Sequence, residues 1–342
     1  MNRLLALLSI VTVFHGAVFA AVPLPADEQY VKSLDGTWRF KLEQAKGDYT
    51  KGEKPQIPPD YPKEFDPFYK PDYKEADGWH DIKVPGNWEM AGHSPATYNQ
   101  PDNASGFYRH TFDVPKAWEG QIVRLNFDGV QNGAEIWLNG EPVKVDEPSW
   151  DRENYHEGGW TAFQVDLTPK VKFGQKNLLA LRVTKNTQSV NLDTGDYHFL
   201  GGVHRPVTLF AVPKAHIDDV KVETTLQDGR QAKVLVIAKT NGAKEVRATL
   251  KGFDPKSATV DDSGVAKIEI PVSDPKLWSA EFPNLYDLNV EVDGHRVHER
   301  VGIREVSIKD GVLPSDWSGL IPSKDALHRD KMYDERRVVK KG

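Results

Sequence analysis

Residues 122–143, which read IVRLNFDGVQNGAEIWLNGEPV, constrain the fold of this chain more than any other stretch. Apolar side chains recur at every second position over 122–127 and again over 133–138, which is the period of a half-buried β-strand. Asn139-Gly140 follows the second run, and this pair is a strong hairpin signal because both residues tolerate a positive φ. The stretch therefore predicts antiparallel β structure, although an antiparallel hairpin in any protein would show the same pattern.

The rest of the chain repeats this pattern of short alternating runs. Trp38 and Phe40 alternate with basic residues, and further runs follow at 161–165, 179–183, 220–222 and 234–236. Turn signals separate the later runs, at Asp228-Gly229, Asn241-Gly242 and Asp293-Gly294. Short strands spaced by turns in this way argue for β-sandwiches. Long helical periodicity and repeats of fixed period are absent, so the sequence predicts an all-β chain.

Residues 44–78 interrupt the β pattern. They are rich in proline, lysine, aspartate and tyrosine, and such a composition excludes a regular helix or a central strand. We expect a surface loop here. The alternative is that the aromatic residues of this segment line a glycan surface: Tyr61, Phe68, Tyr69 and Tyr73.

Composition bounds the function classes open to the chain. Its 342 residues suffice for two or three domains. The formal net charge of -6 gives no electrostatic footprint for nucleic acid, so no nucleic-acid partner is expected. The chain has no cysteine and therefore neither a disulfide framework nor a thiolate metal site. Nine tryptophans suit both a large β core and a sugar-stacking surface.

Residues 1–20 are typical of a signal peptide. A short positive start is followed by the apolar run 4–14, and small residues stand at the −3 and −1 positions of a cleavage site after Ala20. The alternative is an uncleaved anchor. An exported chain without cysteine indicates a bacterial periplasmic or secreted protein, with no membrane span after signal cleavage.

Several motifs follow one another along the chain: SLDGTWRF, VPGNWEMAGHSPATYNQ and the order strand–DGV–strand–WLNG. They resemble stretches of the first domain of glycoside hydrolase family 2, the β-galactosidase and β-glucuronidase group. The most specific match is DTGDYHFLGGVHRPVTLFAVP at 193–213, where the family has an acid followed by Gly-Ile/Val-x-Arg-x-Val-x-Leu. DPKLWSAEFPNLYDLNV at 274–290 is similar to a signature of the family's second domain, and VGIREVSIKDG at 301–311 to the strand that leads out of it.

The resemblance implies a domain plan for the chain. After the signal peptide, residues 21–214 are expected to form a galactose-binding-like jelly-roll sandwich that binds sugar. Residues 213–216 look like a linker. Residues 215–312 are expected to form an immunoglobulin-like β-sandwich, and residues 313–342 an irregular tail.

The resemblance also implies sugar-binding residues. The family's amide that contacts the galactosyl ring falls on Asn99 or Gln100, just after Tyr98, although Asn99 could instead cap a turn. The family's sugar-site acid falls on Asp196, for which the alternative is a loop role or an ion pair with Arg205. His198 stands where the family often has tryptophan, which bears on the preferred sugar. His198 and His204 are a weak metal candidate beside ordinary histidine roles.

Catalysis is not expected from these residues. The resemblance implies a glycosidase whose catalytic carboxylates lie on a separate (β/α)₈ barrel of about 250 residues. Only 30 residues follow Val312, and the chain lacks the Asn-Glu pair of the family's acid/base residue. We therefore predict no catalytic residue, no cofactor and no metal site.

Three functions follow from these expectations. The first is the non-catalytic carbohydrate-binding portion of a β-galactosidase-like enzyme, with a β-galactoside as ligand and a separate catalytic barrel chain as partner. The second is a stand-alone carbohydrate-binding protein with an exposed aromatic strip near Asp196, to which Trp150 or Trp160 contributes. The third is an envelope structural or interaction protein that uses the barrel-facing surface as a partner interface.

Overall fold

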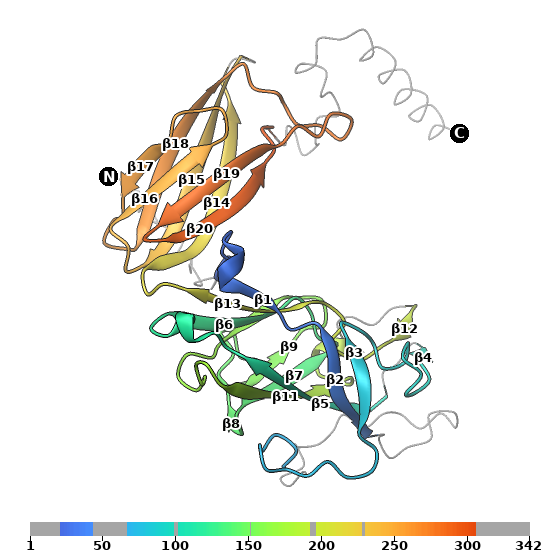
Figure 1. Cartoon of the computed structure of the whole chain (residues 1–342). Helices are drawn as coiled ribbons and strands as arrows, with labels where there is room; N and C mark the ends of the chain where they lie inside the picture. The colour runs from blue at the N-terminus through green and yellow to red at the C-terminus, as the bar shows by residue number, and fades with distance from the viewer. Residues whose placement is uncertain are drawn as a thin grey trace, which may run out of the picture.

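The computed structural model describes residues 21–43, 67–98, 102–150, 152–191, 196–227 and 230–305. Strands dominate these residues, and the helical elements among them are single 3₁₀ turns such as Glu28–Tyr30. The strands form two units, which Figure 1 shows one above the other. Each has its own hydrophobic core, one from residues between Leu34 and Ala211 and the other from residues between Ile217 and Ile303. The prediction of an all-β chain with two sandwiches is confirmed. Within the described ranges, no helix is long and apolar enough to cross a bilayer.

The first unit packs two antiparallel sheets around its core. The smaller sheet has the order β1-β13-β6-β10, made of β1 Val31–Ser33, β13 Val207–Val212, β6 Ile122–Phe127 and β10 Phe163–Asp166. The larger sheet has the order β3-β2-β5-β11-β7-β8, with β9 paired to β7. Its strands are β3 His80–Val84, β2 Gly36–Glu43, β5 Ser105–Asp113, β11 Lys176–Thr184, β7 Gly133–Leu138, β8 Glu141–Pro142 and β9 Tyr155–Glu157.

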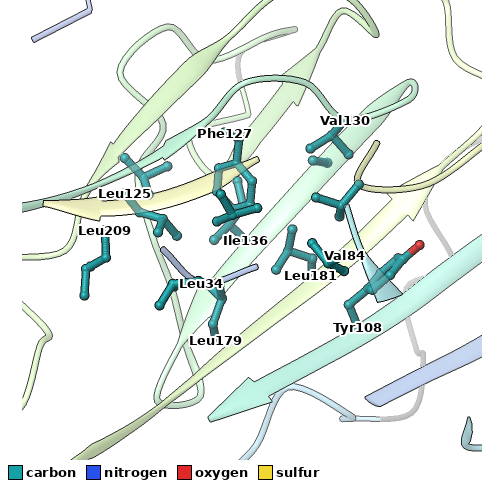
Figure 2. Packing of buried hydrophobic residues seen from close by; sticks show 14 of the residues in the cluster. Leu34, Val84, Tyr108, Leu125, Phe127, Val130, Ile136, Leu179, Leu181 and Leu209 are labelled. Atoms are coloured by element: carbon teal, nitrogen blue, oxygen red, sulfur yellow. The ribbon is translucent and has the colours of Figure 1, made fainter. Parts of the chain in front are cut away.

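The two alternating runs of residues 122–143 are β6 and β7, and they lie in opposite sheets. Residues 128–132 therefore carry the chain across the sandwich, so the two strands do not form a hairpin with each other. Leu125 and Phe127 from β6 meet Ile136 from β7 in the shared core (Figure 2). The period-2 prediction of two strands is confirmed, and the hairpin that the Asn-Gly pair predicts is formed by β7 and β8.

The polar faces of these two strands are buried as well, so the expectation of half-buried strands is wrong. Arg124 of β6 donates to the side-chain oxygen of Gln164 at 3.1 Å and pairs with Asp146. Glu135 of β7 pairs with Arg182 of the neighbouring strand at 3.0 Å. Charges are tolerated in these places because each one meets an opposite charge or a hydrogen-bond partner.

The turn after β7 forms as the sequence predicts. Asn139 has φ 54° and Gly140 has φ 89°, and Leu138 pairs with Glu141 across the turn. Two consecutive positive φ values are the geometry of the tight hairpin turn that Asn-Gly favours.

The part of the proline-rich segment that the structure describes packs on the outer face of the larger sheet. Phe68 is 1% exposed and joins a cluster with Trp79, Phe107 and Trp137. Tyr69 stacks on Trp137 with ring centroids 5.0 Å apart. The absence of strands between 67 and 79 agrees with the predicted loop. The alternative of a glycan surface is wrong for Phe68, because its ring is used to cover the sheet; Tyr61 lies outside the described residues.

The second unit is a smaller sandwich of two antiparallel sheets. One has the order β14-β15-β18, made of β14 His216–Leu226, β15 Gln231–Asn241 and β18 Val265–Ser273. The other has the order β17-β16-β19-β20, made of β17 Lys256–Thr259, β16 Glu245–Leu250, β19 Tyr286–Val292 and β20 His295–Val301. Inward-facing residues of both sheets form its core. Val220 and Val222 contribute only as partly buried neighbours of that core.

Some predicted boundaries in this unit shift. Residues 241–242 and 293–294 form the predicted turns, with positive φ at Gly242, Asp293 and Gly294, whereas the predicted turn at 228–229 lies outside the described residues. His216 is buried and opens β14, so the predicted linker is too long by that residue. The expected exit strand over 301–311 is wrong for 302–305, because β20 ends at Val301.

The first residues of the described chain touch both units. The backbone N–H of Val22 donates to the side-chain oxygen of Gln164 at 3.1 Å, and the Gln164 amide donates back to the Val22 carbonyl at 2.9 Å. Four residues later, the N–H of Ala26 donates to the carbonyl of Arg296 in β20 at 2.7 Å. Residues 22–26 therefore form a strap between the sandwiches, which Figure 1 shows as the dark blue segment.

Candidate functional site

A small two-stranded arm projects from the end of the first unit. It pairs β4 (Thr97–Tyr98) with β12 (His198–Phe199), in the register Tyr98 to His198 (Figure 1). The Tyr98 hydroxyl donates a hydrogen bond to the carboxylate of Asp196. The Tyr98 ring lies 5.2 Å from the His198 ring, and its side chain remains 53% exposed. Three polar or aromatic groups from positions a hundred residues apart thus meet on one exposed surface.

The predicted sugar-site residues divide into two groups. Asp196 and His198 are exposed, and both contact Tyr98. Asn99 and Gln100 lie outside the described residues, directly after β4. The register of the family's amide therefore stays a prediction.

The alternative of an ion pair between Asp196 and Arg205 is not what the described contacts show. The Arg205 guanidinium donates to the carbonyl of Trp160 at 3.0 Å and to that of Asp128 at 3.4 Å. It holds two turns of the same sandwich end together, as a structural residue does. Asp196 instead accepts from Tyr98.

Close packing fixes the base of the arm. Gly201 follows β12, and a Cβ built on it would lie 2.0 Å from the ring of Trp88, which is fully buried. Only a residue without a side chain fits there. The Gly201 N–H donates to the carboxylate of Glu89 at 2.9 Å, so the chain that leaves the arm is hydrogen-bonded to the turn at 88–89.

A buried lysine anchors the segments around the arm. Lys185 is 0% exposed, and its ammonium lies 2.8 Å from the Glu89 carboxylate and 3.3 Å from that of Asp102. Because Glu89 also accepts from Gly201, one cation connects three segments: the turn at 88–89, the residues after the β4 loop, and the residues after β12. We call Lys185, Glu89 and Asp102 the buried triad. A charge this deep requires such pairing, since its desolvation is otherwise very costly.

Backbone and amide contacts extend this anchor. The Lys185 N–H donates to the carbonyl of Ala104 at 3.2 Å, and the Asn132 amide donates to the Lys185 carbonyl at 2.7 Å. Next to it, the Asn186 amide donates to the side-chain oxygen of Asn103 at 2.6 Å. The end of β11 and the chain after β4 are therefore fixed side by side.

Sequence reasoning named Tyr98 as part of a motif but did not place it in the site, and it missed Lys185 altogether. A signal for the lysine was present. Leu179, Leu181 and Val183 point inward by the period of two, and Lys185 is the next residue of that series. A lysine on the inward face of a core strand demands a buried acidic partner.

The described residues offer no metal centre. Within those ranges, no group of three or more His, Asp or Glu side chains is arranged to hold an ion. The predicted candidates have other partners: His198 contacts Tyr98, whereas His204 donates to the Gly159 carbonyl at 2.8 Å and meets the Trp160 ring edge-on. Burial lowers the pKa of His204, so this histidine is held neutral.

The arm carries the chemistry of hydroxyl recognition. An exposed carboxylate accepts hydrogen bonds from vicinal hydroxyls, and a half-exposed phenol ring offers an apolar face with a polar tip. Trp88, Glu89 and Lys185, which anchor the arm, are buried, whereas Tyr98, Asp196 and His198 are exposed.

Comparison with known families matches both units. The family model described as "Glycosyl hydrolases family 2, sugar binding domain" matches residues 31–213. The model described as "Glycosyl hydrolases family 2" matches residues 215–304.

Curated relatives include β-galactosidases. The chain is 28% identical to the β-galactosidase large subunit of Leuconostoc lactis, over 82% of this chain and 47% of that protein. It is 26% identical to the β-galactosidase of Clostridium acetobutylicum, over 85% of this chain and 33% of that protein. The chain thus spans less than half the length of these relatives.

Solved structures share the fold. A β-glucuronidase of Bifidobacterium dentium complexed with coumarin-3-O-glucuronide aligns with a TM-score of 0.66 at 19% identity, over 85% of this chain and 50% of that one. A β-glucuronidase of an uncultured Clostridium aligns with a TM-score of 0.60 at 23% identity, over 85% and 48%.

The ordered motifs, the two sandwiches and the two family models lead to the same assignment. The sugar-binding model alone covers more than half of the chain, and the second model begins two residues after the first ends. The chain belongs to glycosyl hydrolase family 2, of which these residues carry the sugar-binding domain and the immunoglobulin-like domain.

Proposed function

We propose that this chain is a non-catalytic carbohydrate-binding portion of a β-galactosidase-like enzyme and that the arm of β4 and β12 contacts the sugar. The observation that carries the proposal is the meeting of Tyr98, Asp196 and His198 on one exposed surface of a sugar-binding domain. Asn99 and Gln100 belong to the same proposed site through their place directly after β4.

The ligand class follows from the relatives. The curated relatives named above are β-galactosidases, so a β-galactoside is the first ligand to test. We place the catalytic carboxylates on a barrel outside these residues, which makes a barrel-bearing chain the proposed partner. The signal-like residues 1–20 support export to the bacterial periplasm or beyond.

Calorimetric titration of the purified chain with lactose and methyl β-galactoside tests the binding. We expect heats of binding, and we expect Asp196→Asn to weaken the affinity at least about tenfold. Hydrolysis of aryl β-galactosides, β-glucuronides and β-mannosides is measured on the same sample, and we expect no turnover above background. Turnover that disappears when a carboxylate of this chain is replaced would contradict the non-catalytic role.

A second candidate is an envelope interaction protein, favoured by one surface of the second unit. Phe282 is 57% exposed in the connection between β18 and β19, and Leu285, three residues later, is also exposed. Exposed apolar side chains of this kind mark contact sites. Light scattering over a range of protein concentrations tests this role. An average molar mass that rises with concentration, and no longer rises in Phe282→Ser, supports it. A molar mass that stays constant rejects it.

A further inference from the structure

Two tryptophans of the first unit are exposed, in contrast to the others in that unit. Trp150 is 56% exposed and Trp160 is 51% exposed. Five more tryptophans of the same unit are buried: Trp38, Trp79, Trp88, Trp118 and Trp137. An exposed indole does not contribute the free energy that burial of its large apolar surface would provide. Contacts with neighbouring groups hold both of these rings in place.

Trp150 is fixed in a costly conformation. Its φ is 57°, in the left-handed region that a bulky residue rarely adopts. The indole N–H donates to the carboxylate of Glu157, which also accepts from the backbone N–H of Ser189 and, at 3.2 Å, from the Tyr155 hydroxyl. The side chain is thus anchored at its polar edge while most of the ring faces solvent.

Trp160 is anchored by other means. The Arg205 guanidinium donates to its carbonyl at 3.0 Å and lies 5.7 Å from its ring centroid. The ring of His204 meets it edge-on at 5.3 Å. One side of the indole is therefore supported by protein groups, and half of the side chain stays accessible. Rigid aromatic surfaces of this kind lose little entropy when a ligand binds.

The surroundings of the two rings favour a polyhydroxylated ligand over a protein. Charged side chains contact both rings: the Glu157 carboxylate accepts the indole N–H of Trp150, and the Arg205 guanidinium lies 5.7 Å from the centroid of the Trp160 ring. The core of a protein interface is depleted in such charges, whereas a sugar has both apolar C–H faces and hydroxyls that need polar partners.

The same surface connects to the arm. Glu157 binds the N–H of Ser189, and Ser189–Asn191 is the 3₁₀ turn that precedes the segment leading to Asp196. The carboxylate that orients Trp150 therefore also holds the 3₁₀ turn that ends five residues before Asp196 in the sequence.

We propose that Trp150 and Trp160 form a second sugar-stacking surface, which binds further pyranose rings of an oligosaccharide whose end occupies the arm. This inference rests on the proposed function and extends it from a single sugar to a glycan chain. Stacking on the indoles supplies affinity, and the arm supplies recognition of the terminal hydroxyls.

The test compares a one-ring and a four-ring probe by calorimetry on the full chain. Methyl β-galactoside and β-1,4-galactotetraose are titrated into the parent, Trp150→Ala, Trp160→Ala and Trp150→Phe. We expect each alanine variant to weaken tetraose binding at least about tenfold, the effect of losing a tryptophan anchor, and to leave the one-ring affinity unchanged. Trp150→Phe should keep most of the tetraose affinity. The matched control Phe282→Ala removes an equally exposed ring from the second unit and should change neither value.

The outcomes separate this inference from the proposed function. If both probes bind and Asp196→Asn weakens them, but the alanine variants do not affect the tetraose, the stacking surface is rejected and the arm stands. If the alanine variants reduce both affinities equally, or change the mass of the protein in solution, the surface is again rejected. If neither probe binds the parent chain or any variant, both the proposed function and this inference are rejected.

Discussion

At the scale of single residues, the proposed site contains one exposed charge and one buried charge. Asp196 is exposed, and its Oδ1 accepts the hydrogen bond from Tyr98. Lys185 is fully buried and its charge is used entirely inside the protein. Substitutions at these two positions should consequently have opposite signatures in binding and stability.

Replacing Asp196 by asparagine should weaken sugar binding without loss of stability. The variant keeps the shape of the side chain but removes a charge-assisted acceptor, which contributes about 1.5–3 kcal/mol where it is used. We therefore expect affinity for β-galactosides to fall at least about tenfold, with an unchanged thermal midpoint. Unaltered affinity in calorimetry would show that this carboxylate does not touch the sugar.

Replacing Lys185 by methionine should destabilise the first unit strongly. The change leaves the Glu89 carboxylate buried without its cation, and breaking such a pair costs about 3–5 kcal/mol. Lys251→Met is the matched control, because its ion pair with Asp287 is solvent-exposed and should not move the urea midpoint. Similar midpoints for the two variants would contradict the anchoring role of the triad.

At the scale of elements, the positions of the strands could be predicted from the sequence, but the pairing of the strands in the sheets could not. Period-2 alternation and Asn-Gly chemistry are local, so β6, β7 and the turn at 139–140 were predictable. Which sheet each strand joins is decided by long-range packing. The crossing of the chain between the two sheets at residues 128–132 was therefore not predictable. Likewise, the contact between Tyr98 and Asp196 joins residues 98 positions apart and has no local signal.

Gly201→Ala tests how the element beneath the arm is positioned. The new methyl group would overlap the buried ring of Trp88, so the chain after β12 must move. We expect both lower stability, by at least about 1–3 kcal/mol, and weaker sugar binding. Gly120→Ala is the control: its Cβ meets nothing within 4 Å, and only its φ of 88° is strained. That variant should lose some stability and keep full affinity.

At the scale of the whole molecule, each sandwich contains a histidine that burial keeps neutral. Burial lowers the pKa of His156 in the first unit to about 4, and it lowers the pKa of His295 in the second unit to about 4. His295 accepts the N–H of Ile217 on its Nδ1, which a protonated ring cannot do. Acid should therefore affect both units rather than one.

The sign of this effect follows from linkage. The folded pKa of each histidine lies below the ordinary value of 6.5, so its contribution to stability is complete above pH 6.5. It is lost as pH falls from 6.5 towards 4, by up to about 1.4 kcal/mol per pH unit and histidine. The urea midpoint should therefore be lower at pH 5 than at pH 7. His295→Gln should reduce the slope for the second unit, and an unchanged slope would reject the assignment.

The strap of residues 22–26 has a consequence for the order of events in biogenesis. Val22 is buried and bonded through its backbone, which leaves a single residue between Ala20 and the folded body. A processing peptidase needs several accessible, extended residues around the bond that it cuts, and a docked strap does not supply them. If the leader is removed after Ala20, removal must therefore precede docking. In that case the strap docks on the two sandwiches only after cleavage.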